Sequence, residues 1–194
     1  MTPTYAEALA ALGRRLSGAS LKHGEAVADT AARVAERYGV DVDDARLAGV
    51  LHDWCKETPH AELLEEAARR GILVTAVDRA RPYLLHGPVA ASMLAEAFPG
   101  LSGDILRAVE VHTYGAVEMS DLDRVVYVAD MIEPDRDYAG VHKLRAAMAT
   151  ESLGDLFMLA YARSIRHIVR GRRPLHPRTL EVWNSLTIHE AGRP

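Results

Sequence analysis

The chain has 194 residues, of which 48% are hydrophobic and 26% charged, and its formal net charge is −4. This composition is typical of a globular protein rather than of a disordered or fibrous one, and the negative charge argues against nonspecific binding of nucleic acid. One cysteine excludes an intramolecular disulfide, and no uncharged apolar run reaches the ~18 residues that span a bilayer. The first residues lack the basic region of a signal peptide, so we expect a cytoplasmic protein without a membrane partner.

Apolar residues recur at helical spacing along the chain, and no stretch alternates with the period of two that marks a strand. The pattern predicts an all-α fold, a single helical bundle over residues 1–194. In the first half, helices are expected from Tyr5 to Leu16, from about Ser20 to Tyr38, from an Asp41 or Asp43 cap through Ala48, Leu51 and Cys55, and from Pro59 to Gly71.

The second half continues in the same way after a loop containing Pro82. Helices are expected from His86 to Phe98, from a Ser102 cap to the "EVHT" stretch, from a Ser120 cap to Pro134, from Leu153 to Gly171, and from Pro177 onward after a basic loop. The apolar positions of the 153–168 segment are interpreted as core.

Two of these helices carry polar residues where a buried helix would have apolar ones. Asp130 follows five mostly apolar residues in "VVYVAD", and His52 and Asp53 interrupt the apolar stretch "AGVLHDWCKE". A buried carboxylate without a partner costs several kcal/mol or changes its pKa, and a cation is the simplest partner. Adjacent helical residues point about 100° apart, so His52 and Asp53 straddle one site, and Asp53 is well placed to bridge two ions.

A lone histidine in an apolar helix is more often an ordinary core or surface residue than a ligand, and this is our interpretation of His60, His142, His167 and His189. Taken singly, His23, His86 and His112 allow the same interpretation. Together with His52-Asp53 and Asp130, however, they form an ordered set on five expected helices. Imidazole nitrogens combined with carboxylate oxygens favour a divalent transition metal such as zinc, manganese, iron or cobalt over magnesium or calcium.

This set resembles the HD-domain metal-dependent phosphohydrolases, which are defined by a His, a His-Asp pair and a distal Asp. The resemblance is closer to the YqeK branch, symmetrical diadenosine tetraphosphate hydrolases that release two ADP. The matching stretches are "SLKHGEAVADTA", "LAGVLHDWCKE", "LLHGPVAA", "VHTYGAVEMSDLDRVVYVADMIEPDRDYAGV" and "PLHPRTLEVWN". They cover nearly the whole chain.

The resemblance implies a metal held by His23, His52, Asp53 and Asp130, with iron as the typical ion and manganese, cobalt or zinc as other choices. His86 and His112 would hold a second ion or contact phosphate, and with Asp53 they are the expected catalytic residues. The implied substrate contacts, besides these two histidines, are Ser20, Lys56, Glu57, Thr58, Pro59, Arg136, Arg173, Pro174, Leu175, His176, Pro177 and Arg178. The HD core would span about 18–135, with the helices of about 141–190 completing the pocket.

The pattern of residues and the family resemblance indicate the same chemistry, which is metal-assisted hydrolysis of a phosphate. Water activated by the metal would attack a β-phosphorus, and Lys56, Arg136 and Arg173 would stabilise the developing charge. Without the resemblance, Lys56 is equally a solvated lysine, and the "RGRRPLH" loop a solubilising turn. Two other functions stay open: hydrolysis of mononucleotides, by a 5′-nucleotidase or a (d)NTP hydrolase, and noncatalytic nucleotide sensing. The expected partner is a small nucleotide rather than nucleic acid, and a homodimer is compatible with the sequence.

Overall fold

The boundaries of several helices are set by side chains that accept the free N–H groups of the first turn. In the computed structural model, which describes residues 2–191 and the side chains of residues 2–188, the side chains of Asp41, Ser102 and Ser120 each accept the N–H group three residues later. These three caps were predicted from the sequence. Asp41, rather than Asp43, begins the third helix.

Residues 2–191 form eleven α-helices and one 3-10 helix and contain no strand, which confirms the predicted all-α fold. The helices are α1 (Tyr5–Leu12), α2 (Gly18–Tyr38), α3 (Val42–Leu51), α4 (His60–Arg69), α5 (Ala76–Ala80), η1 (Pro82–Leu85), α6 (His86–Ala97), α7 (Gly103–Val111), α8 (Asp121–Ile132), α9 (Val141–Ala147), α10 (Leu153–Arg170) and α11 (Pro177–Ala191).

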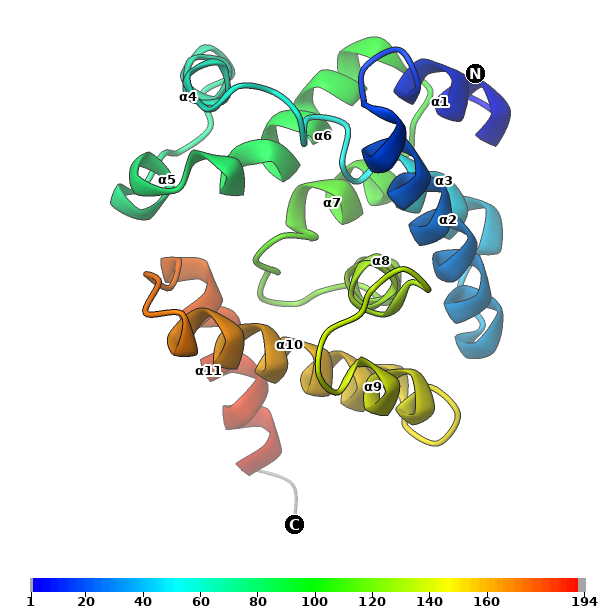
Figure 1. Ribbon diagram of the computed structural model, residues 1–194, viewed down its shortest axis with the longest axis vertical. Coiled ribbons are helices and arrows are strands. Elements are labelled where there is room, and N and C mark those ends of the chain that lie inside the picture. The colour runs from blue at the N-terminus through cyan, green and yellow to red at the C-terminus, as the bar shows by residue number, and fades with distance from the viewer. Residues whose placement is uncertain (1, 192–194) are drawn as a thin grey trace.

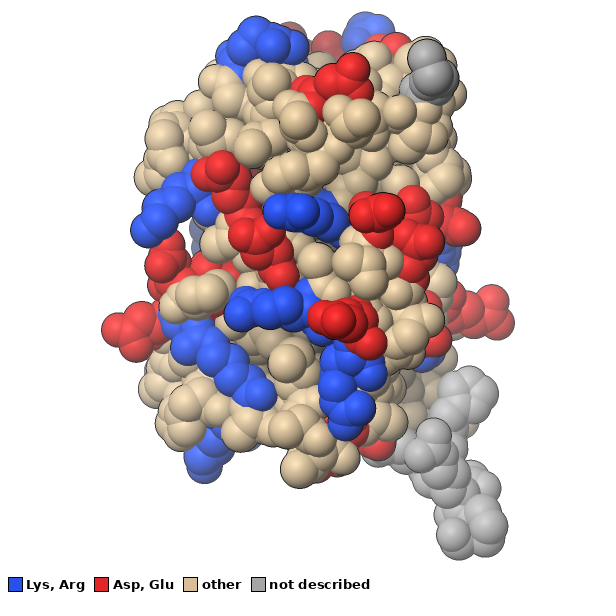
Figure 2. All heavy atoms as spheres, turned by 90° about the vertical axis from the view of Figure 1, so that its right-hand side faces the viewer, with Lys and Arg blue, Asp and Glu red and all other residues tan. Residues whose placement is uncertain are grey.

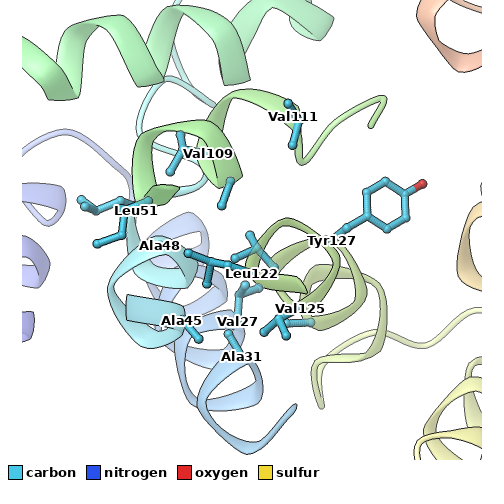
Figure 3. Close-up of a cluster of buried hydrophobic side chains, with 14 of the residues drawn as sticks. Val27, Ala31, Ala45, Ala48, Leu51, Val109, Val111, Leu122, Val125 and Tyr127 are labelled. Atoms are coloured by element: carbon cyan, nitrogen blue, oxygen red, sulfur yellow. The ribbon is translucent and has the colours of Figure 1, made fainter. Parts of the chain in front are cut away.

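Helix α8 lies at the centre of the bundle. It packs against α2, α3 and α7 on one side and against α9 and α10 on the other (Figure 1). Val27 and Ala31 of α2, Ala48 of α3 and Val125 of α8 have no exposed surface, and Figure 3 shows these side chains in one cluster. The face of α2 that carries Val27 and Ala31 therefore forms part of the core, and the polar residues of the same helices are held in a rigid setting.

Two glycines allow close approach between helices of this core. A Cβ atom on Gly49 of α3 would lie 2.9 Å from Cα of Ala28 in α2. A Cβ atom on Gly87 of α6 would lie 2.9 Å from the carbonyl oxygen of Glu110 in α7. Since each glycine lies within three residues of a predicted metal ligand, the two contacts set the distances between the helices that carry those ligands.

Two predicted helix ends are wrong. Helix α1 ends at Leu12 rather than Leu16, and residues 13–16 form a turn. Helix α3 ends at Leu51 and does not continue to Cys55. At this end of the helix, the carbonyl oxygen of Gly49 lies 2.7 Å from Nδ1 of His52. The chain then continues in turns, in which the N–H group of Lys56 donates to the carbonyl of Asp53.

The segment expected as a loop around Pro82 contains α5 and η1. With five and four residues, these helices are too short to produce a periodic apolar pattern.

On the outer face shown in Figure 2, Lys and Arg side chains alternate with Asp and Glu side chains, so no field of a single sign forms there. Within residues 2–191, no helix is long and apolar enough to cross a membrane.

Candidate metal centre

Six side chains predicted from the sequence lie together where α2, α3, α6, α7 and α8 meet. They come from the second turn of α2, the end of α3, the start of α6, the end of α7 and the last turns of α8 (Figure 1). The six are His23, His52, Asp53, His86, His112 and Asp130. Four imidazoles and two carboxylates therefore form one cluster.

Asp53 lies at the centre of this cluster, and its side chain is 4% exposed. One carboxylate oxygen, Oδ2, lies 3.4 Å from Nε2 of His23 and 3.1 Å from Nε2 of His52. The other oxygen, Oδ1, lies 3.2 Å from Nε2 of His86 and 3.9 Å from Nε2 of His112. The carboxylate thus places one oxygen toward each half of the cluster.

Asp130 closes the first half of the cluster from the opposite side. Its Oδ1 atom lies 3.0 Å from Nε2 of His23 and 3.9 Å from Nε2 of His52. In the second half, Nε2 of His86 lies 2.9 Å from Nε2 of His112. Two nitrogens this close cannot both carry a proton, so at least one of them presents a lone pair.

The histidine rings are oriented by backbone carbonyl groups. Nδ1 of His52 lies 2.7 Å from the carbonyl oxygen of Gly49, and Nδ1 of His112 lies 2.7 Å from that of Val109. Nδ1 of His86 lies 2.5 Å from the carbonyl oxygen of Tyr83. In all three contacts the carbonyl belongs to the residue three positions earlier. An acceptor at Nδ1 holds the ring proton there and leaves the lone pair on Nε2, the atom that faces the cluster.

Both carboxyl groups are held in the ionised form. Burial alone would raise the pKa of Asp53, but His52 and His23 beside it hold that pKa well below its usual range. Burial also opposes ionisation of Asp130, but a hydrogen bond from His23, the nearby imidazole of His52 and the guanidinium of Arg136 keep its pKa below the ordinary value. The cluster therefore contains two ionised carboxylates at neutral pH.

The imidazoles differ in their affinity for a proton. Burial opposes protonation of His23, but its hydrogen bonds to Asp130 and Asp53 outweigh burial and raise its pKa to about 9. Burial, together with the neighbouring imidazoles of His86 and His52, lowers the pKa of His112 to about 3. A proton on His23 thus occupies the position, between two carboxylates, where a cation is expected.

The donor atoms fit a divalent transition metal. Single atoms of His23, His52 and Asp130 lie within 4.8 Å of one another, as do single atoms of His52, Asp53 and His112. Nε2 of His52 is buried and has no hydrogen-bond partner within residues 2–188, which is costly for a polar atom unless it has a ligand. Mixed nitrogen and oxygen donors suit zinc, iron, manganese or cobalt.

Two basic side chains approach the carboxylates from outside the cluster. Nζ of Lys56 lies 2.5 Å from Oδ2 of Asp53. Arg136 donates from Nη2 to Oδ1 of Asp130 and from Nε, at 2.8 Å, to the carbonyl oxygen of the same residue. These two cations form a basic rim beside the cluster, and guanidinium and ammonium groups are of the kinds that suit phosphate.

A cavity of about 340 Å³ adjoins this rim. Arg136 and Arg173, both predicted to contact substrate, line it together. The other lining residues are Tyr83, Leu84, Thr113, Met131, Tyr138, Arg163, Ser164, His167 and Ile168. Apolar and aromatic walls with a few cations are the setting that a nucleoside with attached phosphates requires.

The other predicted substrate residues are distributed over several places. His176 is buried, its Nε2 lies 3.3 Å from Oδ2 of Asp78, and with Arg173 and Pro174 it lines a small adjoining cavity. Its ring stacks on Tyr114 at 4.4 Å. Arg178 lines a different cavity of about 500 Å³.

Residues 56–59 form the turn that follows Asp53, and within it the side chain of Glu57 accepts hydrogen bonds from the N–H and hydroxyl groups of Ser17. This contact ties the turn to the start of α2, where Ser20 lies. The side chain of His189, expected to play no part, lies outside the described residues.

Sequence reasoning missed part of the cavity wall. Arg163 and His167 lie four residues apart on α10, a spacing that places them on one face of a helix and that was available in the sequence. From the sequence alone, His167 is interpreted as an ordinary core or surface residue. Tyr83 and Tyr138 lie in the 3-10 helix and in a loop, where no periodic signal exists. Glu133 was also missed, because a glutamate before a proline is typical of an exposed helix end.

Comparison with known proteins places these residues in a family. A model of the HD domain family matches residues 21–135. The symmetrical bis(5′-nucleosyl)-tetraphosphatase of Bacillus subtilis is 32% identical over 180 residues, which are 93% of this chain and 96% of that protein. The protein of the same name from Halalkalibacterium halodurans is 30% identical over 87% of this chain and 89% of its own length.

A solved structure agrees with both relatives. The crystal structure of a predicted HD superfamily hydrolase involved in NAD metabolism, from Clostridium acetobutylicum, superposes with a TM-score of 0.90 at 31% identity and covers 97% of this chain and 100% of that one. The family predicted from the sequence is therefore confirmed. The chain belongs to the HD-domain family of metal-dependent phosphohydrolases, in the branch of the symmetrical bis(5′-nucleosyl)-tetraphosphatases.

Proposed function

We propose that the chain hydrolyses diadenosine tetraphosphate symmetrically and releases two ADP. The observation that carries the proposal is the position of the six-residue cluster beside a cavity lined by Arg136 and Arg173. The names of the two relatives, which cover most of this chain, support the same substrate and the same position of cleavage. The segment of about 141–190 contributes Arg163 and His167 of α10 and Arg173 of the following loop to the cavity and would complete the pocket.

The proposed metal ligands are His23, His52, Asp53 and Asp130, with His86 and His112 holding a second ion or contacting phosphate. Iron is the metal we propose, with manganese, cobalt or zinc as other candidates. When bound, the metal supplies Lewis acidity toward phosphoryl oxygens and activates water at neutral pH.

The protein's own residues neutralise and orient the substrate. Lys56 and Arg136 now contact the carboxylates of Asp53 and Asp130, and they would hold the charge of the central phosphates beside the cluster. The second pKa of a phosphate monoester is about 6, so the ADP leaving group departs at neutral pH without a strong acid. Stabilisation of negative charge, rather than proton donation, is therefore the main task of these side chains.

Product analysis tests this function. Protein purified without oxygen and loaded in turn with iron, manganese, cobalt or zinc is mixed with diadenosine tetraphosphate, ATP or AMP, and products are separated by chromatography. The expected result is two ADP from the dinucleotide, with one oxygen-18 atom per pair of ADP when the reaction is run in labelled water.

The alternatives each give a different outcome. ATP with AMP would indicate asymmetric cleavage, and nucleoside or tripolyphosphate released from mononucleotides would indicate a 5′-nucleotidase or a (d)NTP hydrolase. Tight binding of the dinucleotide to the metal-loaded protein without cleavage would support a sensing module. Any of these results would overturn the proposal.

A further inference from the structure

A third carboxylate lies beside the metal centre and is buried more completely than Asp130. Glu133, the C-cap residue that follows α8, is 2% exposed, whereas the Asp130 side chain is 23% exposed. A buried carboxylate requires hydrogen-bond partners that compensate for lost water. Its Oε2 atom accepts the backbone N–H group of Asp135 at 2.6 Å, and its Oε1 atom lies 3.6 Å from Nε of Arg136.

The remaining partner of Glu133 is a predicted metal ligand. Oε1 lies 3.3 Å from Nδ1 of His23, while Nε2 of the same ring faces the cluster, 3.0 Å from Oδ1 of Asp130. The imidazole therefore lies between Glu133 on one side and the metal centre on the other. A neutral imidazole carries a single ring proton, and a metal needs the lone pair of the nitrogen that faces it.

The other three histidines show why His23 needs a side-chain partner. His52 and His112 lie at the C-terminal ends of α3 and α7, where the backbone carbonyl three residues earlier is available to Nδ1. Nδ1 of His86, where η1 meets α6, faces the carbonyl of Tyr83 in the same way, although that carbonyl also accepts the backbone N–H group of His86. His23 lies inside α2, where the carbonyl groups of the preceding turn accept N–H groups of the helix itself. Glu133 provides for His23 the acceptor that the backbone provides for the other three.

The position of Glu133 is fixed by α9. The side chain of Arg145 donates to the carbonyl oxygens of Ile132, Glu133 and Arg136, at 2.9, 2.6 and 2.9 Å. These bonds hold the turn after α8 against the bundle. The acceptor beside His23 is thus part of a rigid backbone arrangement, as required of a group that orients a ligand.

We propose that Glu133 is a positioning residue of the metal centre, whose carboxylate keeps the proton of His23 on Nδ1 and so directs the Nε2 lone pair at the metal. The proposal rests on the metal centre of the proposed function and adds a residue to it. Removal of an acceptor behind a metal-bound histidine typically weakens metal binding by about 10- to 100-fold.

A competing role for Glu133 is that of a counter-ion for Arg136. Two substitutions separate the roles. Glu133→Met has a similar volume and no acceptor, whereas Glu133→Gln keeps an acceptor oxygen and loses the charge. Asp135→Asn is the matched control, because Asp135 is an exposed carboxylate two residues away that pairs with Lys22 at 2.8 Å.

The measurement is the affinity of the metal-free protein for Co²⁺ and Mn²⁺, by calorimetry and by the absorption spectrum of bound Co²⁺. Glu133→Met should weaken binding by about 10- to 100-fold, while Glu133→Gln and Asp135→Asn stay close to the unmodified protein. The proposal is overturned if Glu133→Met binds as tightly as Asp135→Asn, or if Glu133→Gln is as weak as Glu133→Met, since charge alone would then explain the effect.

A second measurement needs no variant and stays informative if Glu133→Met fails to fold. Long-range proton–nitrogen NMR spectra of the Zn²⁺-loaded protein report which nitrogen of His23 carries the proton. A proton on Nδ1 supports the proposal, and a proton on Nε2 overturns it. Neither measurement uses hydrolysis, so failure to cleave the dinucleotide would refute the proposed function and leave this result unaffected.

Discussion

The replacement of Gly87 by alanine tests whether the distance between α6 and α7 sets the geometry of the metal centre. Gly87 follows His86, and a Cβ atom at this position would lie 2.9 Å from the carbonyl oxygen of Glu110 and 3.1 Å from that of Val109. The Val109 carbonyl also lies 2.7 Å from Nδ1 of His112. The added methyl group therefore pushes against the backbone that orients one histidine, from a position next to the other.

The size of the effect follows from these distances. The closest contact is about 0.5 Å shorter than the 3.4 Å at which ordinary contact begins, and a backbone carbonyl cannot rotate away as a long side chain can. Added volume in a tightly packed core costs about 1–3 kcal/mol. For a chain of this length, a loss of stability of that size lowers Tm by about 2–12 °C. To relieve the contact, α6 must move away from α7.

Gly103→Ala is the matched control, because Gly103 also lies near the start of a helix and a Cβ atom there meets no atom within 4 Å. Both variants gain the same kind of helix propensity, so the difference in Tm between them isolates the steric cost. Thermal unfolding followed by circular dichroism gives the difference in Tm. Titration with Co²⁺ gives the affinity of the metal centre in each variant. If the two variants unfold at the same temperature and bind Co²⁺ alike, the reasoning is wrong.

Three further predictions follow from single side chains. Asp53→Ala removes the carboxylate shared by both halves of the cluster and should abolish metal loading and ADP release. The control is His142→Ala, at an exposed position, which should keep both. Full activity of Asp53→Ala would refute the site. Burial raises the pKa of the Cys55 thiol to about 11, whereas a thiol in denatured protein has a pKa of about 8.5. Since only the thiolate reacts, alkylation at about pH 8 should be far slower in native than in denatured protein. Equal rates would contradict the burial of Cys55. Asp78→Ala removes the partner of His176 and should raise KM for the dinucleotide more than it lowers kcat in steady-state kinetics; a loss confined to kcat would contradict a role in holding the 173–178 segment.

The family and the all-α fold could be predicted because the His52-Asp53 pair and Asp130 interrupt otherwise apolar helical patterns. Asp130 after "VVYVA" and His52-Asp53 after "AGVL" are visible without a structure, since burial is implied by their neighbours. The short distances among the six side chains follow from the packing of α2, α3, α7 and α8, and no single helix contains that information.

The cavity could be predicted only in part, for a physical reason. Arg136 and Arg173 belong to recognisable stretches, but Tyr83 and Tyr138 lie where the backbone is irregular, and irregular segments carry no periodic signal. Glu133 is buried because Arg145, twelve residues later in the chain, folds the turn back against the bundle. Burial that depends on a distant residue leaves no trace in the local sequence.

The adjacent His52-Asp53 pair lies at the end of α3. The helix ends at Leu51, but the backbone of His52 keeps helical angles, with φ −55° and ψ −37°. Oδ2 of Asp53 lies 3.1 Å from Nε2 of His52, while Oδ1 faces Nε2 of His86 at 3.2 Å. The adjacent His-Asp pair can therefore serve one centre, because one oxygen of the carboxylate lies beside its neighbour and the other reaches the second half of the cluster.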